Sequence, residues 1–409
     1  MEASSKASGS SLPPPFSLSS VPQTRKRKAS SKSPLSNESD ESSSSSSTSS
    51  SSTMSTSLLK LGSYDGDQVS NWNTLQLESF GIFYDVKATE LSELYKSAQE
   101  KMCSSAVNNA TFWTKLVKIK EILIESTKKC LHILDVDEEF DMEDLDWADV
   151  KEESQKCGQA IAKVREEMSL KIGSLDNLSR DLYSIWFTGI SEYIQYYSDL
   201  IKELNSSRRN GVEGEFRQLL TFFSKIFLMS PRTGDALQKV QMRLCGKETT
   251  SVPDLRYILQ GDFFDESEKT VSLVTVDTRE LKTWSLADDE KTTTDFNIRN
   301  LKFSGQSVER LLGQHGGELL VESMKSVLRS TNLGIICIKT MIIFTRLEWA
   351  KGHYKCLLKG TKAEEKRSNI HYSKPYNFLV RKDREEILDT MFNLGLLCRV
   401  RSLLAYQEQ

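Results

Sequence analysis

The sequence predicts an α+β fold: a disordered N-terminal tail, a helical middle domain, and a C-terminal domain with a small mixed sheet flanked by helices. Three observations predict it. Serine dominates the first 62 residues, apolar residues recur at helical spacing over 63–205, and β-branched runs alternate with helical stretches over 206–409. We therefore expect domain boundaries near residues 62 and 205.

The amino-acid composition limits which classes of protein this chain can belong to. The chain has 409 residues, of which 38% are hydrophobic and 27% charged, so a sizeable core is expected. A net charge of -3 gives no bulk attraction to nucleic acid, which must then bind through local basic patches. Seven scattered cysteines and four histidines form no metal-ligand spacing. The N-terminus has no apolar core of signal-peptide length, and the longest apolar run, Gly334 to Phe344, is interrupted by Lys339 and too short to span a membrane. We therefore expect a soluble intracellular protein without a membrane partner.

The tail is predicted to remain disordered. Between Ser36 and Ser57, 14 of 22 residues are serine, and little apolar surface is available to offset the entropy of ordering. The tail also carries a compact basic cluster that is typical of a nuclear import signal, consisting of Arg25, Lys26, Arg27 and Lys28. We expect nuclear localisation, with the cytoplasm as second choice if the cluster is only a solubilising charge run.

The middle domain is predicted to be helical throughout. Apolar stripes predict helices near 91–98, 113–134, 160–170 and 178–204, and the aromatic residues of the last one are interpreted as packing. Between them, Asp135 to Val150 holds nine acidic residues interleaved with bulky apolar ones. This pattern is typical of partner-binding activation segments, but the favoured interpretation is an acidic loop whose Trp147 docks on its own domain at the start of a helix.

The C-terminal domain is predicted to alternate helices and strands. After a polar linker at 206–214, the expected helices are 215–229, 306–328 and 382–404. The second of these helices could be interrupted at Gly313 or at Gly316-Gly317. The expected strands are 255–259 and 271–276, a dense β-type region at 333–349, and a return strand at 354–358 after a turn at Lys351-Gly352.

One short pattern in this domain could carry chemistry. Pro253-Asp254 leads into the first of these strands, and Glu280-Leu281-Lys282 follows the second. Because residues i and i+2 of a strand share a face, Glu280 and Lys282 would point together, with Asp254 opposite them across a hairpin. A rival candidate for the acid-x-Lys triplet, Asp277-Thr278-Arg279, directly follows the apolar run and carries arginine in place of lysine.

This pattern resembles the signature of the PD-(D/E)XK nuclease superfamily. That resemblance implies a core of one helix, three strands, a second helix and a fourth strand. It also implies catalytic Asp254, Glu280 and Lys282, with Mg²⁺ held by Asp254 and Glu280. In the family an acid on the first helix often joins the metal site, and Glu215 matches that position.

Two functions are therefore carried forward. The first is a nuclear protein with a PD-(D/E)XK-like domain, active or degenerate, acting on nucleic acid. The alternative is a non-enzymatic nuclear protein that binds protein partners through its helical domain and acidic segment. It would need no cofactor.

Overall fold

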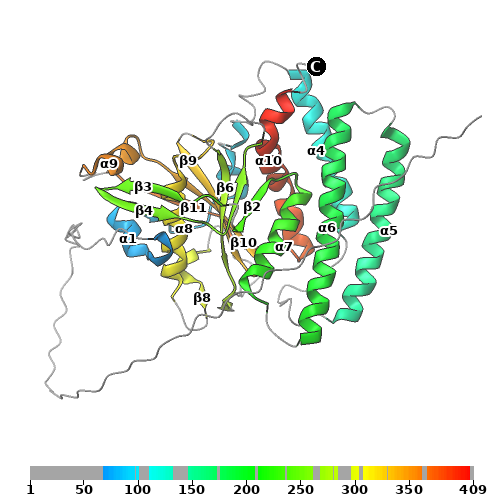
Figure 1. Ribbon diagram of the computed structural model, residues 1–409, viewed down its shortest axis with the longest axis horizontal. Coiled ribbons are helices and arrows are strands. Elements are labelled where there is room, and N and C mark those ends of the chain that lie inside the picture. The colour runs from blue at the N-terminus through cyan, green and yellow to red at the C-terminus, as the bar shows by residue number, and fades with distance from the viewer. Residues whose placement is uncertain are drawn as a thin grey trace, which may run out of the picture. The chain divides into compact units, whose positions relative to one another are not determined.

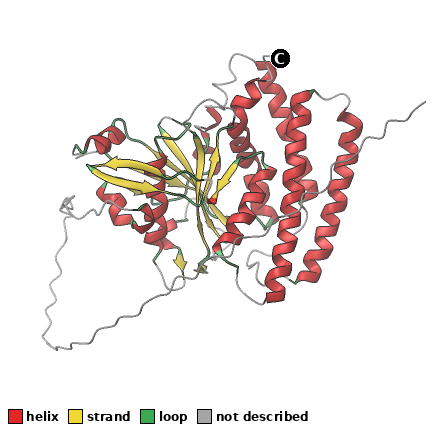
Figure 2. Ribbon diagram, viewed as in Figure 1, coloured by secondary structure: helices red, strands yellow, loops and turns green. Residues whose placement is uncertain are grey.

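The computed structural model describes residues 68–405, apart from 97, 101–109, 132–145, 173–175, 208–210, 235–236, 261–267, 280, 284–295, 304–306, 329 and 362–365. The basic cluster at 25–28, the serine-rich segment and most of the acidic segment lie outside the described residues. The chain from Leu58 to Gln409 clusters into one compact unit. The α+β class is confirmed, because helices cover both faces of a central mixed sheet (Figures 1 and 2).

The central sheet has the strand order β2-β5-β6-β9-β10-β11-β1, with β12 beside β10. Its strands are β1 (Ile82–Tyr84), β2 (Pro231–Thr233), β5 (Leu255–Ile258), β6 (Thr270–Asp277), β9 (Thr331–Ile338), β10 (Met341–Glu348), β11 (Ser368–Tyr372) and β12 (Tyr376–Asn377). Two pairs are parallel, β6 with β9 and β1 with β11, and the others are antiparallel. Strands β6 and β9 are almost wholly buried, as their continuous apolar sequences require.

One face of the sheet is covered by α7 (Glu213–Ile226) and α10 (Arg381–Ala405), and the long helix α6 (Asn177–Ser207) packs outside α7. Helices α4 (Ala110–Cys130) and α5 (Trp147–Ile172) pack against α6. Their apolar stripes meet in one core that includes Trp186, Phe223 and Phe392. The indole N–H of Trp186 donates to the Thr127 hydroxyl at 2.8 Å, which joins α6 to α4.

The opposite face is covered by α8 (Val308–Glu322), which makes the crossover between the parallel strands β6 and β9. The 3₁₀ turn η2 (Val69–Asn71) and α1 (Thr74–Ser79) pack onto α8. The helix runs unbroken through Gly313, Gly316 and Gly317. The missing side chains of these glycines let neighbouring segments approach the helix closely. A Cβ atom on Gly313 would lie 2.2 Å from the Cα of Asn73.

Two further hairpins stand apart from the central sheet. The first joins β3 (Val240–Leu244) to β4 (Lys247–Ser251), and its inward face, including Met242, belongs to the core under α8. The second joins β7 (Leu281–Thr283) to β8 (Lys302–Phe303), the latter preceded by the 3₁₀ turn η6 (Ile298–Asn300).

Two expectations are corrected by the structure. The predicted return strand at 354–358 is part of helix α9 (His353–Lys359), which lies between left-handed glycines, Gly352 at φ 78° and Gly360 at φ 64°. The strand that returns beside β10 is β11 instead. The segment 63–205 is not wholly helical, since β1 lies within it and joins the sheet, although α2 (Leu91–Leu94) is helical as expected.

Trp147 docks as the favoured interpretation predicted. It is the first residue of α5, packs against the helical core, and lies under the Lys202 ammonium at 6.0 Å. Its backbone N–H donates to the Asn205 side chain at 2.6 Å, which fixes the start of the helix on α6.

Candidate functional site

Asp254 is held against β6 at the start of β5. Its backbone N–H donates to the carbonyl oxygen of Val274 at 3.1 Å. Its side-chain Oδ2 accepts from the N–H of Val276 at 2.7 Å, and the side chain is 18% exposed. The Pro-Asp sequence therefore leads into the hairpin as predicted, with the carboxylate fixed across the end of the adjacent strand.

The first turn of α7 supplies charged neighbours. Arg217 Nη1 lies 3.8 Å from Asp254 Oδ1 and 3.8 Å from Glu213 Oε1. Burial raises the pKa of Asp254 to about 6; the Val276 amide opposes the rise and the Glu213 carboxylate adds to it. Asp254 is thus a buried acid coupled to a second carboxylate and to a guanidinium.

Glu215, the predicted acid of the first helix, occupies a different position. Its Oε2 accepts from the backbone N–H of Val212 at 2.9 Å, which caps the start of α7. Residues two apart on a helix face different sides, so Glu213 faces Asp254 while Glu215 turns back to the cap. Sequence reasoning missed Glu213 because it assigned that residue to the linker at 206–214.

The predicted acid-x-Lys triplet lies beyond the strand that pairs with β5. Strand β6 ends at Asp277, Glu280 lies outside the described residues, and the backbone of Lys282 belongs to β7. The register of β5 and β6 brings Thr275 opposite Asp254. Within the described residues, the candidate site at this end of the sheet is therefore built on Asp254.

The rival triplet at the end of β6, Asp277-Thr278-Arg279, forms its own ion pair. Arg279 Nε donates to Asp277 Oδ1 at 2.9 Å and to Oδ2 at 2.7 Å, and Arg279 Nη2 also contacts Oδ2. The guanidinium carbon lies 4.4 Å above the ring of Phe303. Arginine here is fixed by a carboxylate and an aromatic face, so it supplies a fixed positive charge next to the strand that holds Asp254.

A buried polar network lies between α8 and the central sheet. Thr275 Oγ1 is 2.6 Å from Glu318 Oε2 and 2.7 Å from His315 Nδ1, and His315 Nε2 is 2.7 Å from Thr345 Oγ1. Burial raises the pKa of Glu318 to about 8, with a further rise from Asp254, and lowers the pKa of His315 to about 3. Both groups are therefore neutral at pH 7.

This network was missed because its members are ordinary residues in the sequence of a helix and two strands. His315 precedes a pair of glycines within an apolar helical stretch, and no local spacing links it to Thr275 or Thr345. Only the parallel crossover from β6 through α8 brings them together. The network is sealed from solvent, so its role is in the core.

No metal centre is complete among the described side chains. No group of three histidine, cysteine, aspartate or glutamate residues is close enough to hold an ion within the described part of the chain. Asp254 and Glu213 form a pair of carboxylates instead. The described cysteines are free thiols, and four of those six are buried.

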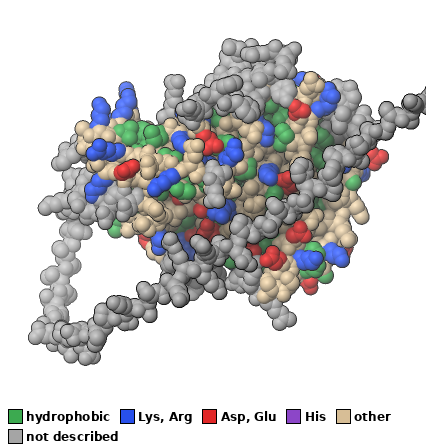
Figure 3. All heavy atoms as spheres, in the orientation of Figure 1, with side chains coloured by type: hydrophobic (Ala, Val, Ile, Leu, Met, Phe, Trp, Pro, Cys, Tyr) green, Lys and Arg blue, Asp and Glu red, His purple; other side chains and the backbone are tan. Residues whose placement is uncertain are grey.

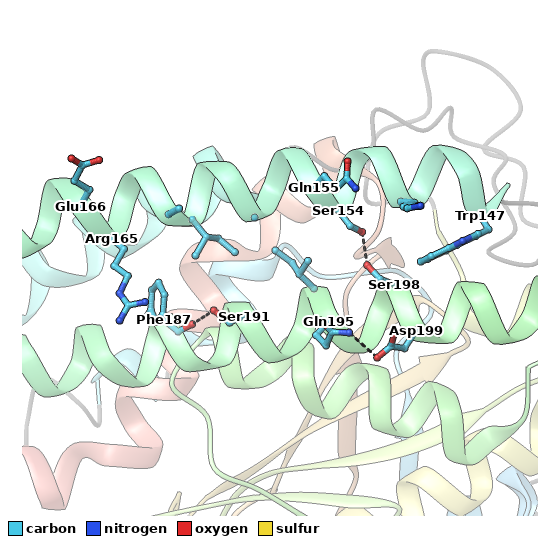
Figure 4. A pocket seen from close by; sticks show the side chains of 15 residues that line it. Trp147, Ser154, Gln155, Arg165, Glu166, Phe187, Ser191, Gln195, Ser198 and Asp199 are labelled. Carbon is cyan, nitrogen blue, oxygen red and sulfur yellow. Dashed lines mark hydrogen bonds between the residues drawn. The ribbon is translucent and has the colours of Figure 1, made fainter. Parts of the chain in front are cut away.

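A separate groove of about 780 Å³ lies between α5 and α6, far from Asp254 in sequence (Figure 4). The Arg165 guanidinium lies 5.0 Å over the Phe187 ring, and the hydroxyls of Ser154 and Ser198 hydrogen-bond across the two helices. These polar groups are engaged with one another. The groove offers a largely apolar surface bordered by polar and charged side chains, and among its described residues no nucleophile is paired with a base.

Comparison with known proteins gives no match to any family model, curated protein or solved structure. No described helix combines the length and the apolar character needed to cross a membrane.

Proposed function

We propose that the segment from α7 to β9 is a PD-(D/E)XK-like domain that acts on phosphodiester bonds of nucleic acid in the nucleus. The observation that carries the proposal is the order of the central-sheet strands and their covering helices: helix α7, strands β2, β5 and β6, helix α8 and strand β9. The β3–β4 pair is inserted after β2, and the β7–β8 pair is inserted after β6. The first three strands are antiparallel neighbours and the fourth is parallel to the third. Pro253-Asp254 leads into the middle strand, as in the signature of that superfamily.

The chemistry of the donor set fits a divalent cation. Mg²⁺ commonly takes one or two carboxylates together with phosphate oxygens, and Asp254 and Glu213 form such a pair. When bound, the ion would polarise the phosphate and activate water. Burial raises the pKa of Asp254 most and Glu213 adds to the rise, and a cation between the two carboxylates would favour their ionised forms.

Positive charge is also available beside the pair. Arg217 reaches both carboxylates from α7, and Arg279 follows β6. In this proposal they stabilise charge that develops on the phosphate. Glu280 and Lys282, which follow the end of β6 along the chain, remain the predicted acid-x-Lys pair.

Cleavage and metal binding test the proposal together. The protein is incubated with labelled single-stranded DNA, duplex DNA or RNA in Mg²⁺, Mn²⁺ or EDTA, and its melting temperature is measured with and without metal. Asp254→Asn should abolish both cleavage and the metal-induced rise in melting temperature, and Glu280→Gln should abolish cleavage. Asp289→Asn, in a chance acid-x-Lys triplet, should leave both intact.

Absence of any metal response in the wild-type protein would sink the catalytic proposal, as would cleavage by Asp254→Asn at the wild-type rate. The alternative, a non-enzymatic nuclear protein that binds protein partners, then takes its place. Two observations favour that alternative: arginine stands at the lysine position of the triplet at the end of β6, and the groove between α5 and α6 presents a largely apolar surface.

A further inference from the structure

The outer end of the β3–β4 hairpin and helix α9 form one continuous surface. The backbone N–H of Cys245, at the tip of the hairpin, donates to the carbonyl oxygen of Leu357 in α9 at 3.0 Å. A Cβ atom on Gly360 would lie 3.5 Å from the Cα of Cys245. Leu244 and Leu357 point into the core, so the opposite sides of both elements face solvent.

That solvent-facing side is strongly basic. Alternation along β3 turns Arg243 outward. Lys355 and Lys359 lie four residues apart on one side of α9, and Lys351 lies in the turn just before the helix begins. We call the following six residues the basic face: Arg243, Lys351, Lys355, Lys359, Lys366 and Arg367. All six are exposed.

The basic face differs sharply in charge from the rest of the chain. Residues 239–248 and 351–367 together hold nine basic and three acidic residues, a net charge of +6, although the whole chain carries -3. Figure 3 shows Lys and Arg side chains gathered at the end of the molecule where Figure 1 labels β3, β4 and α9. Within the described residues, no carboxylate lies at ion-pair distance from Lys351, Lys355 or Lys359.

We propose that the basic face binds the phosphate backbone of nucleic acid. The inference rests on the proposed function for the class of ligand, and it names the surface that would hold that ligand. The hairpin connects the two sites: β4 ends at Ser251, three residues before Asp254. A five-residue strand spans roughly 17 Å, so a nucleic-acid strand lying along the hairpin would pass from the basic face towards Asp254.

The surrounding side chains favour nucleic acid over an anionic membrane. Helices that lie on membranes bury a broad apolar side in the lipid, whereas α9 buries its own apolar side, with His353 and Leu357, in the protein core. Leu358, 41% exposed, is the single large apolar side chain exposed among the described residues of α9. Arg367 lies 5.2 Å over the ring of Phe83, which holds its charge at the surface.

Fluorescence anisotropy with a labelled 20-nucleotide single strand and a 20-base-pair duplex, in EDTA to exclude cleavage, tests this inference. The test variant is the triple charge reversal Lys351→Glu/Lys355→Glu/Lys359→Glu. The control is Lys118→Glu/Lys129→Glu/Lys163→Glu, which makes the same charge change at exposed positions on α4 and α5. Circular dichroism establishes that both variants fold.

The test variant should bind at least about 30-fold more weakly at 100 mM NaCl, and the slope of log Kd against log salt for the duplex should fall by roughly 2 to 3. The control should change affinity by less than about threefold. Equal behaviour of the two variants would overturn the inference. So would unchanged nucleic-acid binding by the test variant combined with loss of binding to phosphatidylserine vesicles, which would assign the face to a membrane.

Failure of this inference can be told apart from failure of the proposed function. Binding that depends on the basic face without metal-dependent cleavage supports the binding surface and refutes the catalytic proposal. If the test variant keeps both its cleavage activity and its affinity for nucleic acid, the catalytic proposal is supported and the binding surface is refuted.

Discussion

Replacement of Glu318 by glutamine should alter how the stability of the protein depends on pH. Thr275 has one hydroxyl proton but contacts both Glu318 and His315, so one of these contacts needs the proton from the other side. With Glu318 ionised, Thr275 Oγ1 donates to Glu318 Oε2. With Glu318 protonated, the carboxyl can donate to Thr275 instead, which leaves the Thr275 proton for His315 Nδ1 and the His315 Nε2–H for Thr345. Glutamine keeps a donor at this position and cannot ionise.

The sign and size of the effect follow from the pKa values. The pKa of Glu318 is raised from 4.5 to about 8, so its stabilising contribution is complete below pH 4.5 and is lost as pH rises through 8. At about 1.4 kcal/mol per pH unit, the total loss approaches roughly 5 kcal/mol, of which about 2 kcal/mol falls between pH 6.5 and 8. The pKa of His315 is lowered from 6.5 to about 3, so its contribution is lost only as pH falls below 6.5.

Melting temperatures of wild type and Glu318→Gln, measured by differential scanning calorimetry from pH 6.5 to 9, isolate the Glu318 contribution. Groups that titrate equally in both proteins cancel in the difference. The variant should gain roughly 2 to 3 °C on the wild type as pH rises from 6.5 to 8, because about 2 kcal/mol is spread over the large entropy of unfolding of a unit that spans residues 58–409. A difference that stays constant over this range would refute the protonated, one-directional hydrogen-bond chain.

Three further outcomes are expected. Arg256→Met should lower the free energy of unfolding in urea by about 3–5 kcal/mol, because it leaves the buried carboxylate of Glu322 without its ion-pair partner. The double variant Arg256→Met/Glu322→Leu should recover most of this loss, and a double variant no more stable than the single one would contradict the explanation. Gly313→Ala should lower the melting temperature through a loss of about 1–3 kcal/mol, since its Cβ meets backbone, whereas Gly158→Ala on α5 has open space and should stabilise by about 0.5–1 kcal/mol. Alanine at all four positions 25–28 should shift a fluorescent fusion from nucleus to cytoplasm, and an unchanged distribution would reject the import signal.

The sequence predicted the long, strongly periodic elements well. Helices α6 and α7 and strand β6 follow apolar patterns that extend over several turns or pleats. The β9–β10 hairpin was harder to divide, because its turn uses Lys339 at φ 52° where glycine or asparagine would have signalled it. Helix α9 is short, and its signal lay in the two glycines that bound it, not in its apolar residues.

The candidate site was predictable only in part. Pro253-Asp254 stood out because, with the two β-type runs and the acid-x-Lys triplet after it, it resembles the nuclease signature, and the structure fixes Asp254 at the start of β5. Glu213 depends on where α7 begins, and helix ends are the least certain feature of a sequence pattern. The basic face draws on two segments more than 100 residues apart, so its charge becomes concentrated only after folding.

The parallel pairing of β1 with β11 has a consequence for how the chain folds during synthesis. Ile82 pairs with Ser368, so this edge of the sheet needs a partner that is translated 286 residues later. At about 5–20 residues per second, β1 waits roughly 15–60 s on the ribosome before its partner is made. During that interval its backbone hydrogen-bonding groups lack their native partner, so residues 82–84 are where we expect a chaperone to engage the nascent chain.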